Sequence, residues 1–141
     1  MAGIIGSLFT FPAIGSWYEK LNQPSFSPPN WLFGPVWTVL YLMMGVSAYL
    51  IWQKGLDNKT VRIALVIFAI QLILNSFWSI IFFGMKNLSF ALAEIVILWI
   101  FIVLTIIKFY PIDKKAAYLL IPYLLWVSFA TFLNYSILRL N

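Results

Sequence analysis

Glu94 is the first residue to consider for chemistry, because it is the only charged residue between positions 87 and 107. A carboxyl group inside an apolar span is a functional candidate by default, and proton relay is the specific interpretation. It lies about 9 Å from the start of its expected helix, so it either reaches the membrane surface or stays protonated and bonded to a neighbour. The chain has no His and no Cys, and no second acid lies in a span, so acid–base or nucleophilic catalysis has no visible apparatus.

Amide and aromatic side chains recur at helical spacing in two apolar stretches. The first face holds Gln71, Asn75, Trp78 and Phe82, and the second holds Trp126, Ala130, Leu133, Asn134 and Ile137. An amide at membrane depth needs a hydrogen-bond partner, so both faces should point inward and bring their amides into one polar cluster. Such a cluster either joins helices or lines a cavity for a flat aromatic ligand, and the spacing leaves both open.

The composition places these residues in lipid. The chain is 63% hydrophobic and 9% charged, with a mean hydropathy of +0.96, whereas soluble domains carry about 25% charged residues. Without His or Cys, the usual zinc sites and haem ligation by His or thiolate are excluded, and we expect no metal site and no required cofactor. The net charge is +5, and the nine Lys and Arg residues lie mainly in short connections. They form no Arg-rich stripe, which argues against nucleic acid as a partner.

Charged residues divide the chain into segments long enough to cross a bilayer, for which about 20 apolar residues suffice. We therefore expect one all-α transmembrane domain, residues 1–141, with helices at about 2–18, 32–53, 62–84, 88–109 and 115–138. The connection at about 19–31 contains Pro24, Pro28 and Pro29, which exclude regular helix, and should form a rigid, lid-like loop.

The basic residues predict the orientation in the membrane. The second and fourth connections hold Lys54, Lys59, Arg62, Lys108, Lys114 and Lys115, and the opposite side holds Lys20, Lys86 and Arg139. Cytoplasmic connections carry the excess of Lys and Arg. In a multi-pass protein of the cell membrane, the N-terminus is therefore expected in the cytoplasm.

Aromatic, proline and amide residues along nearly the whole chain form a specific pattern. It consists of Trp17-Tyr18, Leu21, Pro24, Pro28-Pro29, Trp31, Pro35, Trp37, Leu40-Tyr41, Gly45, Trp52, Gln71-Leu72, Leu74-Asn75, Trp78, Phe82-Phe83-Gly84, Pro122-Tyr123-Leu124, Trp126, Phe129-Ala130-Thr131 and Leu133-Asn134-Tyr135. With this pattern the chain closely resembles bacterial-type members of the TspO / translocator protein family, also called the tryptophan-rich sensory protein or peripheral benzodiazepine receptor family.

The resemblance implies five helices around a pocket beneath the first loop. The implied ligands are protoporphyrin IX and other tetrapyrroles, isoquinoline carboxamide drugs and, in animal members, cholesterol; homodimers are common. By position, the implied ligand-binding residues are Trp31, Phe33, Pro35, Asn75, Trp78, Phe90, Ala93, Trp126, Ala130, Leu133 and Asn134. The sterol-recognition stretch falls on Leu133, Tyr135 and Arg139.

The resemblance also implies light-dependent oxidative breakdown of protoporphyrin, in which the porphyrin carries the photochemistry and the protein orients it. Trp31 and Trp126 are then the leading candidates for stacking on the ring and donating electrons. Two alternatives stay open: a translocator of porphyrins, lipids or sterols, and a ligand-responsive stress sensor without turnover. No inverted repeat or pair of broken helices supports transport.

Overall fold

The computed structural model describes residues 32–84 and 87–140, and the side chains of Phe33, Phe83 and Gly84 are not described. The expected first helix, the Pro-rich loop and Trp31 lie outside the described residues. Within the described ranges the regular structure is entirely helical: α2 is Phe33–Trp52, α3 is Lys59–Ser79, the π-helical segment η3 is Ile80–Gly84, α4 is Leu88–Phe109, α5 is Lys114–Leu119 and α6 is Ile121–Leu140.

These elements form four stretches that are long and apolar enough to cross a membrane: Gly34–Trp52, Lys59–Phe82, Leu88–Phe109 and Lys114–Leu140. Large apolar side chains remain exposed along all of them, among them Leu42, Ile73, Ile100 and Leu125. A soluble protein could not leave so much apolar surface in water, whereas the lipid of a membrane solvates such a surface. The described part of the chain is therefore a multi-pass membrane protein.

Polar caps begin three of the helices. Asn58 accepts a 2.9 Å bond from the backbone N–H of Thr60, and Asn87 accepts one of 3.0 Å from that of Phe90. Asp113 accepts from the backbone N–H of Lys115 at 2.9 Å. Each capping residue has an extended backbone and satisfies a donor that the helix cannot. The helix starts therefore follow from short polar turns between the apolar spans.

The last span is not one continuous helix, as the sequence alone suggested, but α5 followed by α6. The two meet at Leu120, and Pro122 lies in the first turn of α6. Proline has no backbone N–H to give to the carbonyl of Tyr118 four residues earlier, so an unbroken helix would lose a bond there. The break gives α5 its own packing against α2, where the Ser47 hydroxyl donates to the Ala116 carbonyl at 2.7 Å.

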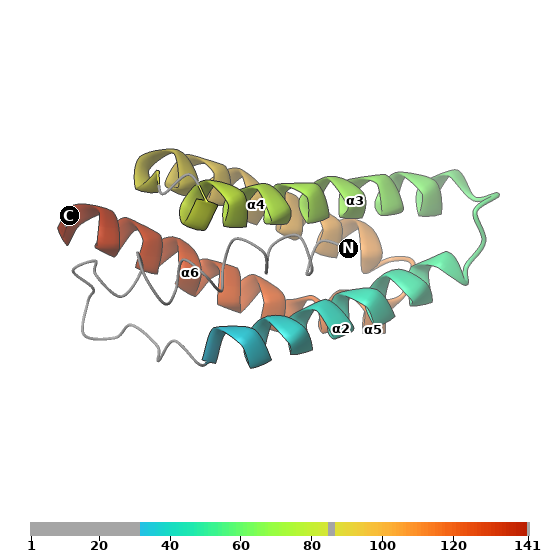
Figure 1. The fold of residues 1–141 in the computed structure, drawn as a ribbon. Helices are drawn as coiled ribbons and strands as arrows, with labels where there is room; N and C mark the ends of the chain where they lie inside the picture. The colour runs from blue at the N-terminus through green and yellow to red at the C-terminus, as the bar shows by residue number, and fades with distance from the viewer. Residues whose placement is uncertain (1–31, 85–86, 141) are drawn as a thin grey trace.

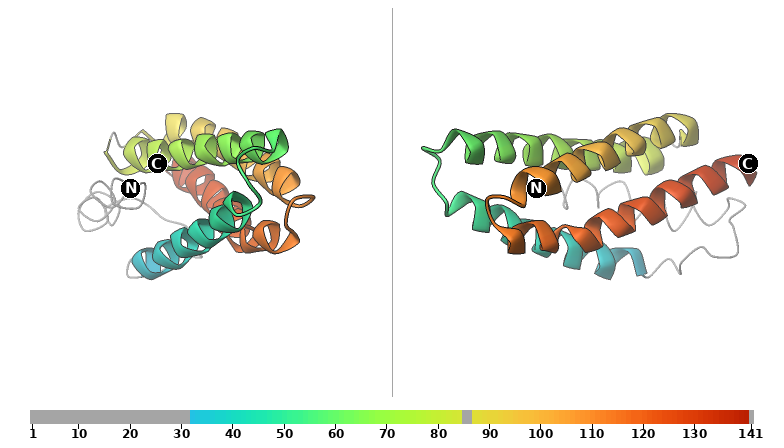
Figure 2. Two further views of the ribbon diagram at one scale, coloured as in Figure 1. Left: turned by 90° about the vertical axis from the view of Figure 1, so that its right-hand side faces the viewer. Right: turned by 180° about the vertical axis from the view of Figure 1, so that it is seen from behind.

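The helices pack as a bundle in which α3 and α4 lie side by side and α6 packs against α4 (Figure 1). Toward its N-terminus α2 diverges from the α3–α4 pair, as the end-on view in Figure 2 shows, and near its C-terminal end it lies beside α5. The core combines aliphatic residues of all these helices, including Met44, Ala64, Ile95, Leu98, Ile102, Leu120 and Val127. In the N-terminal half of α2, the Trp37 ring contacts the rings of Tyr123 and Trp126 on α6.

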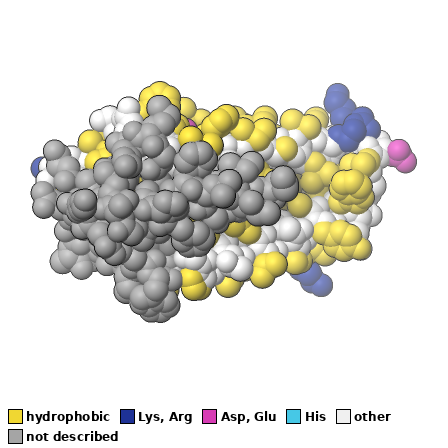
Figure 3. All heavy atoms as spheres, in the orientation of Figure 1, with side chains coloured by type: hydrophobic (Ala, Val, Ile, Leu, Met, Phe, Trp, Pro, Cys, Tyr) yellow, Lys and Arg dark blue, Asp and Glu magenta, His cyan; other side chains and the backbone are white. Residues whose placement is uncertain are grey.

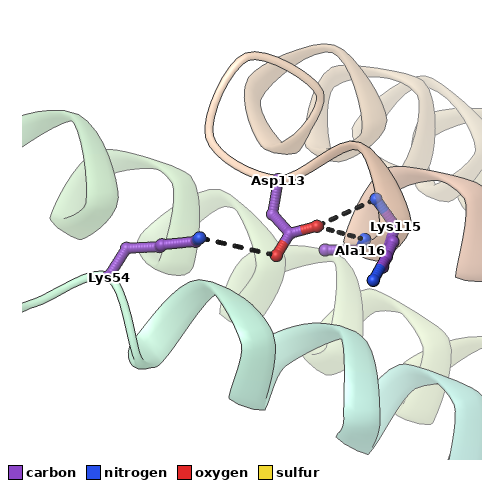
Figure 4. A network of polar contacts seen from close by, with 4 residues as sticks. All are labelled: Lys54, Asp113, Lys115 and Ala116. Carbon is purple, nitrogen blue, oxygen red and sulfur yellow. Dashed lines mark hydrogen bonds and ion pairs between the residues drawn. The ribbon is translucent and has the colours of Figure 1, made fainter.

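Basic side chains gather at the end of the bundle formed by the α2–α3 and α4–α5 connections (Figure 3). The two connections meet there, with the Lys54 ammonium 3.9 Å from the Asp113 carboxylate, which also caps α5 (Figure 4). One face of the membrane therefore receives both connections.

Candidate functional site

A chain of hydrogen bonds crosses the interior and joins α2, α3 and α6. The Tyr41 hydroxyl donates to Asn75 Oδ1, and Asn75 Nδ2 donates to the Tyr123 hydroxyl at 2.8 Å. Tyr123 in turn donates to Gln71 Oε1 at 2.8 Å, and Gln71 Nε2 points at the Met44 sulfur 4.0 Å away. Each member supplies what the next one needs, so the chain is satisfied although it lies away from water.

A second polar cluster lies about one turn further along α3, at its C-terminal end. Trp78 Nε1 donates to Asn134 Oδ1 at 3.2 Å, and Asn134 Nδ2 donates to the Leu88 carbonyl at 3.1 Å. The sequence predicted that Gln71 and Asn75 would meet Asn134 in one cluster, and this was wrong. Tyr123, and not Asn134, bonds to the two amides of α3. The two residues lie about three helical turns apart on α6, so they reach different partners.

Aromatic rings of α2 and α6 pack beside the first chain of hydrogen bonds. The Trp37 ring lies 5.7 Å from that of Tyr41, 6.4 Å from that of Tyr123 and 6.4 Å from that of Trp126, between centroids. Phe129 extends the cluster, with its centroid 5.6 Å from Trp126. Ring pairs at such distances gain from edge-to-face and tilted contacts beyond the area that they bury. We call these five residues, Trp37, Tyr41, Tyr123, Trp126 and Phe129, the aromatic cluster.

Four of the five residues of the aromatic cluster, Trp37, Tyr41, Tyr123 and Phe129, were not among the predicted site residues. A signal for Tyr123 was available: it precedes Trp126 by three residues and Ala130 by seven, and so continues the face selected on this helix. Tyr41 has no comparable signal. Its partner Asn75 lies on another helix, 34 positions away in sequence.

The predicted ligand-binding residues fall into two groups. Six face the interior: Asn75, Trp78, Ala130, Leu133 and Asn134 are buried and Trp126 is half-buried. Pro35, Phe90 and Ala93 lie exposed on α2 and α4, and Phe90 is 56% exposed. Trp31 and the side chain of Phe33 lie outside the described part. The structure thus brings the α3 and α6 members together and leaves the three exposed ones apart from them.

The residues of the sterol-like motif do not share one face of α6. Leu133 is buried, whereas Tyr135 and Arg139 are exposed, with the Arg139 guanidinium 5.8 Å from the centre of the Tyr135 ring. These two lie four residues apart and form one surface pair at the C-terminal end of the bundle, because side chains at that spacing are neighbours on a helix.

Glu94 is buried, with 8% of its surface exposed, and among the described residues neither carboxyl oxygen has a hydrogen-bond partner. The sequence left two plain alternatives for Glu94. Its burial excludes the one in which it reaches the membrane surface, and within residues 32–84 and 87–140 no neighbour forms the hydrogen bond that the other required. The position of Glu94 on the buried stripe of α4, with Ala91, Ile95 and Leu98, holds it in the interior.

No group of three His, Cys, Asp or Glu side chains that could hold a metal occurs within residues 32–84 and 87–140. The polar groups of the interior are amides, phenols, indoles and one carboxyl. These can position a flat organic molecule by stacking and by hydrogen bonds.

The fold and its interior define a class: a small multi-pass helical membrane protein whose bundle contains amide–phenol hydrogen bonds and clustered indoles. The comparisons with known proteins narrow this class. The sequence profile of the TspO/MBR family matches residues 1–140, and the chain belongs to this family.

Similar proteins occur in bacteria and animals. The chain is 51% identical to the "Tryptophan-rich protein TspO" of Chlorobaculum tepidum, over 99% of this chain and 88% of that one. It is 36% identical to "Protein CrtK" of Rhodobacter capsulatus, over 99% and 86%. It is also 39% identical to the "Translocator protein" of Homo sapiens, over 97% and 82%.

Proposed function

We propose that this membrane protein binds tetrapyrroles such as protoporphyrin IX inside its bundle and promotes their light-dependent oxidative breakdown. The observation that carries the proposal is the aromatic cluster, in which rings from α2 and α6 contact one another and two of them, Tyr41 and Tyr123, hydrogen-bond to Asn75. Aromatic faces stack on a flat macrocycle, and a few fixed polar groups orient it. Isoquinoline carboxamides are flat and apolar and suit the same interior.

The breakdown step uses the light absorbed by the porphyrin itself. The excited macrocycle takes an electron from a nearby indole and passes it to dissolved dioxygen, which gives superoxide and an indole radical cation. The radical cation then recovers an electron from the macrocycle, and the oxidised ring combines with the superoxide, so that dioxygen is the terminal oxidant. Trp126 is the principal donor, because it contacts both Trp37 and Phe129 within the cluster. Trp31, in the first connection, is the second candidate. The protein's part is to hold the ring and donor together, since the porphyrin supplies the reactive excited state.

The test is the absorbance spectrum of the purified protein with protoporphyrin IX, in the dark and under light, with and without dioxygen. A shifted porphyrin band in the dark with oxygen-dependent loss under light supports both binding and breakdown. A shift without loss supports binding only. An unshifted band, with light-driven loss no faster than in empty detergent micelles, contradicts the proposal.

Translocation of porphyrins, lipids or sterols is the second candidate, because the human relative is named a translocator protein. Net movement of porphyrin into proteoliposomes in darkness, without loss of total absorbance, would favour it. A homodimer belongs to either proposal, and chemical cross-linking in native membranes tests it.

A further inference from the structure

Three exposed side chains converge where α4 ends and α5 begins. Tyr110 directly follows α4, Lys114 is the first residue of α5, and Tyr118 lies about one turn further along α5. The rings of Tyr110 and Tyr118 lie 6.1 Å apart, edge to face, and the Lys114 ammonium lies 5.6 Å from the centre of the Tyr110 ring. The two tyrosines are 44% and 58% exposed. We call these three residues the interfacial patch.

Among the described residues, the Lys114 ammonium has no acidic partner. The connections at this end of the bundle, residues 54–62 and 108–115, hold six basic side chains and two acids, Asp57 and Asp113. Asp113 caps α5 and pairs with Lys54. A Lys ammonium carries three N–H donors, and one ring face attracts its charge without satisfying all three. Lys114 therefore retains positive charge and donors for a partner at the outer surface.

The interfacial patch lies at the boundary of two apolar spans, one ending at Phe109 and the next beginning at Lys114. Toward the middle of the bundle, Ile107 is 57% exposed three residues before Tyr110, and Ile121 is 38% exposed three residues after Tyr118. Tyrosine rings gather at this depth because one end is apolar and the other polar. The polar groups thus border apolar surface that continues into the membrane, which suits a molecule with a polar head and apolar chains.

We propose that the interfacial patch binds the phosphate group of an anionic phospholipid, with Lys114 as the charge partner and the hydroxyls of Tyr110 and Tyr118 as further donors. Phosphate oxygens accept strong, charge-assisted hydrogen bonds from such groups. The excess of basic residues predicts that this end faces the cytoplasmic leaflet, which is rich in anionic lipid. A zwitterionic lipid offers the same phosphate but adds a cationic group, which the surrounding Lys and Arg repel. The patch is therefore selective for anionic headgroups.

The experiment counts the lipids bound to the purified protein by native mass spectrometry. Delipidated protein in detergent is titrated with phosphatidylglycerol or phosphatidylcholine of identical acyl chains, so that only the headgroup differs. Lys114→Gln removes the charge, and Lys114→Arg keeps it. The double change Tyr110→Phe and Tyr118→Phe removes both hydroxyls and keeps the rings. Lys59→Gln is the matched control, because it removes another exposed lysine at the same end of the bundle, at the start of α3.

We expect the wild type, Lys114→Arg and Lys59→Gln to bind the first phosphatidylglycerol more tightly than phosphatidylcholine. Lys114→Gln should weaken this first binding about fivefold, which is the effect of one basic residue beside anionic lipid, and should change phosphatidylcholine binding much less. Loss of both tyrosine hydroxyls should weaken it about threefold. All these changes are made at exposed side chains, so the unfolding temperature without added lipid should stay the same.

Three results would overturn the inference: a wild type without preference for phosphatidylglycerol, a preference that Lys114→Gln leaves intact, or an equal loss in Lys59→Gln, which would show that only the total charge matters. Glycerol 3-phosphate tests the other source of a phosphate group. Displacement of the bound lipid by this soluble headgroup at equal concentration would also contradict a lipid site. No step depends on porphyrin, so this inference and the proposed tetrapyrrole function can fail independently.

Discussion

The side-chain amide of Asn75 donates a 2.8 Å hydrogen bond to the Tyr123 hydroxyl and thereby fixes α3 to α6 inside the bundle. The same hydroxyl donates to Gln71. One phenol thus satisfies two amides on one helix, and both amides are buried. This small network positions the aromatic cluster, because Tyr123 is a member of both.

Replacing Tyr123 with Phe should destabilise the protein. The change removes one oxygen but leaves the Asn75 amide and the Gln71 carbonyl without their partner in a low-dielectric interior. Hydrogen bonds in membrane bundles contribute about 1 kcal/mol, so we expect a loss of about that size in the free energy of unfolding. The measurement is unfolding in mixed detergent, followed by circular dichroism. Tyr49→Phe is the control, because this tyrosine is 59% exposed; equal effects of the two changes would refute the role of the network.

Replacing Trp126 with Phe should slow the light-driven loss of porphyrin absorbance severalfold. Phenylalanine keeps most of the ring contacts with Trp37 and Phe129 but is a much poorer electron donor. Binding in the dark should change little. Trp52→Phe provides the comparison, since that indole is 60% exposed at the end of α2. An unchanged rate in Trp126→Phe would remove this residue from the mechanism.

Asp113 should contribute to stability mainly as a helix cap. Its carboxylate accepts from the backbone N–H groups of Lys115 and Ala116, whereas its ion pair with Lys54 is long, at 3.9 Å, and partly exposed. Loss of an N-cap costs about 1 kcal/mol, and an exposed ion pair contributes less than that. Asp113→Ala should therefore destabilise the protein more than Lys54→Ala, while Asp113→Asn should retain most of the stability. Thermal unfolding in detergent checks the order, and a larger effect of Lys54→Ala would reverse our assignment.

The orientation in the membrane can be read from single cysteines, because the natural chain has none. Asp57→Cys lies in the connection at the basic end, and Asn87→Cys lies at the opposite end of the bundle. We expect a membrane-impermeant thiol reagent to label Asn87→Cys in intact cells and Asp57→Cys only after the membrane is opened. The reverse pattern would show that the N-terminus faces outward.

The described spans were predictable because the signal is simple. A bilayer requires long uncharged stretches, and the charged residues mark where each stretch ends. The inward face of α6 was also visible, since Ala130, Leu133 and Asn134 repeat at helical spacing and are buried. The caps at Asn58, Asn87 and Asp113 follow from local side-chain chemistry that acts within three residues.

The sequence by itself determined that the protein is embedded in a membrane. It also determined which segments span the bilayer and which residue types need polar partners inside it. Only the tertiary structure decided the partners: Tyr123 for Gln71 and Asn75, Trp78 for Asn134, and none among the described residues for Glu94. The reason is physical. Hydropathy and helical periodicity act along one helix, whereas a hydrogen bond between helices depends on their relative rotation and depth, which the packing of the whole bundle sets.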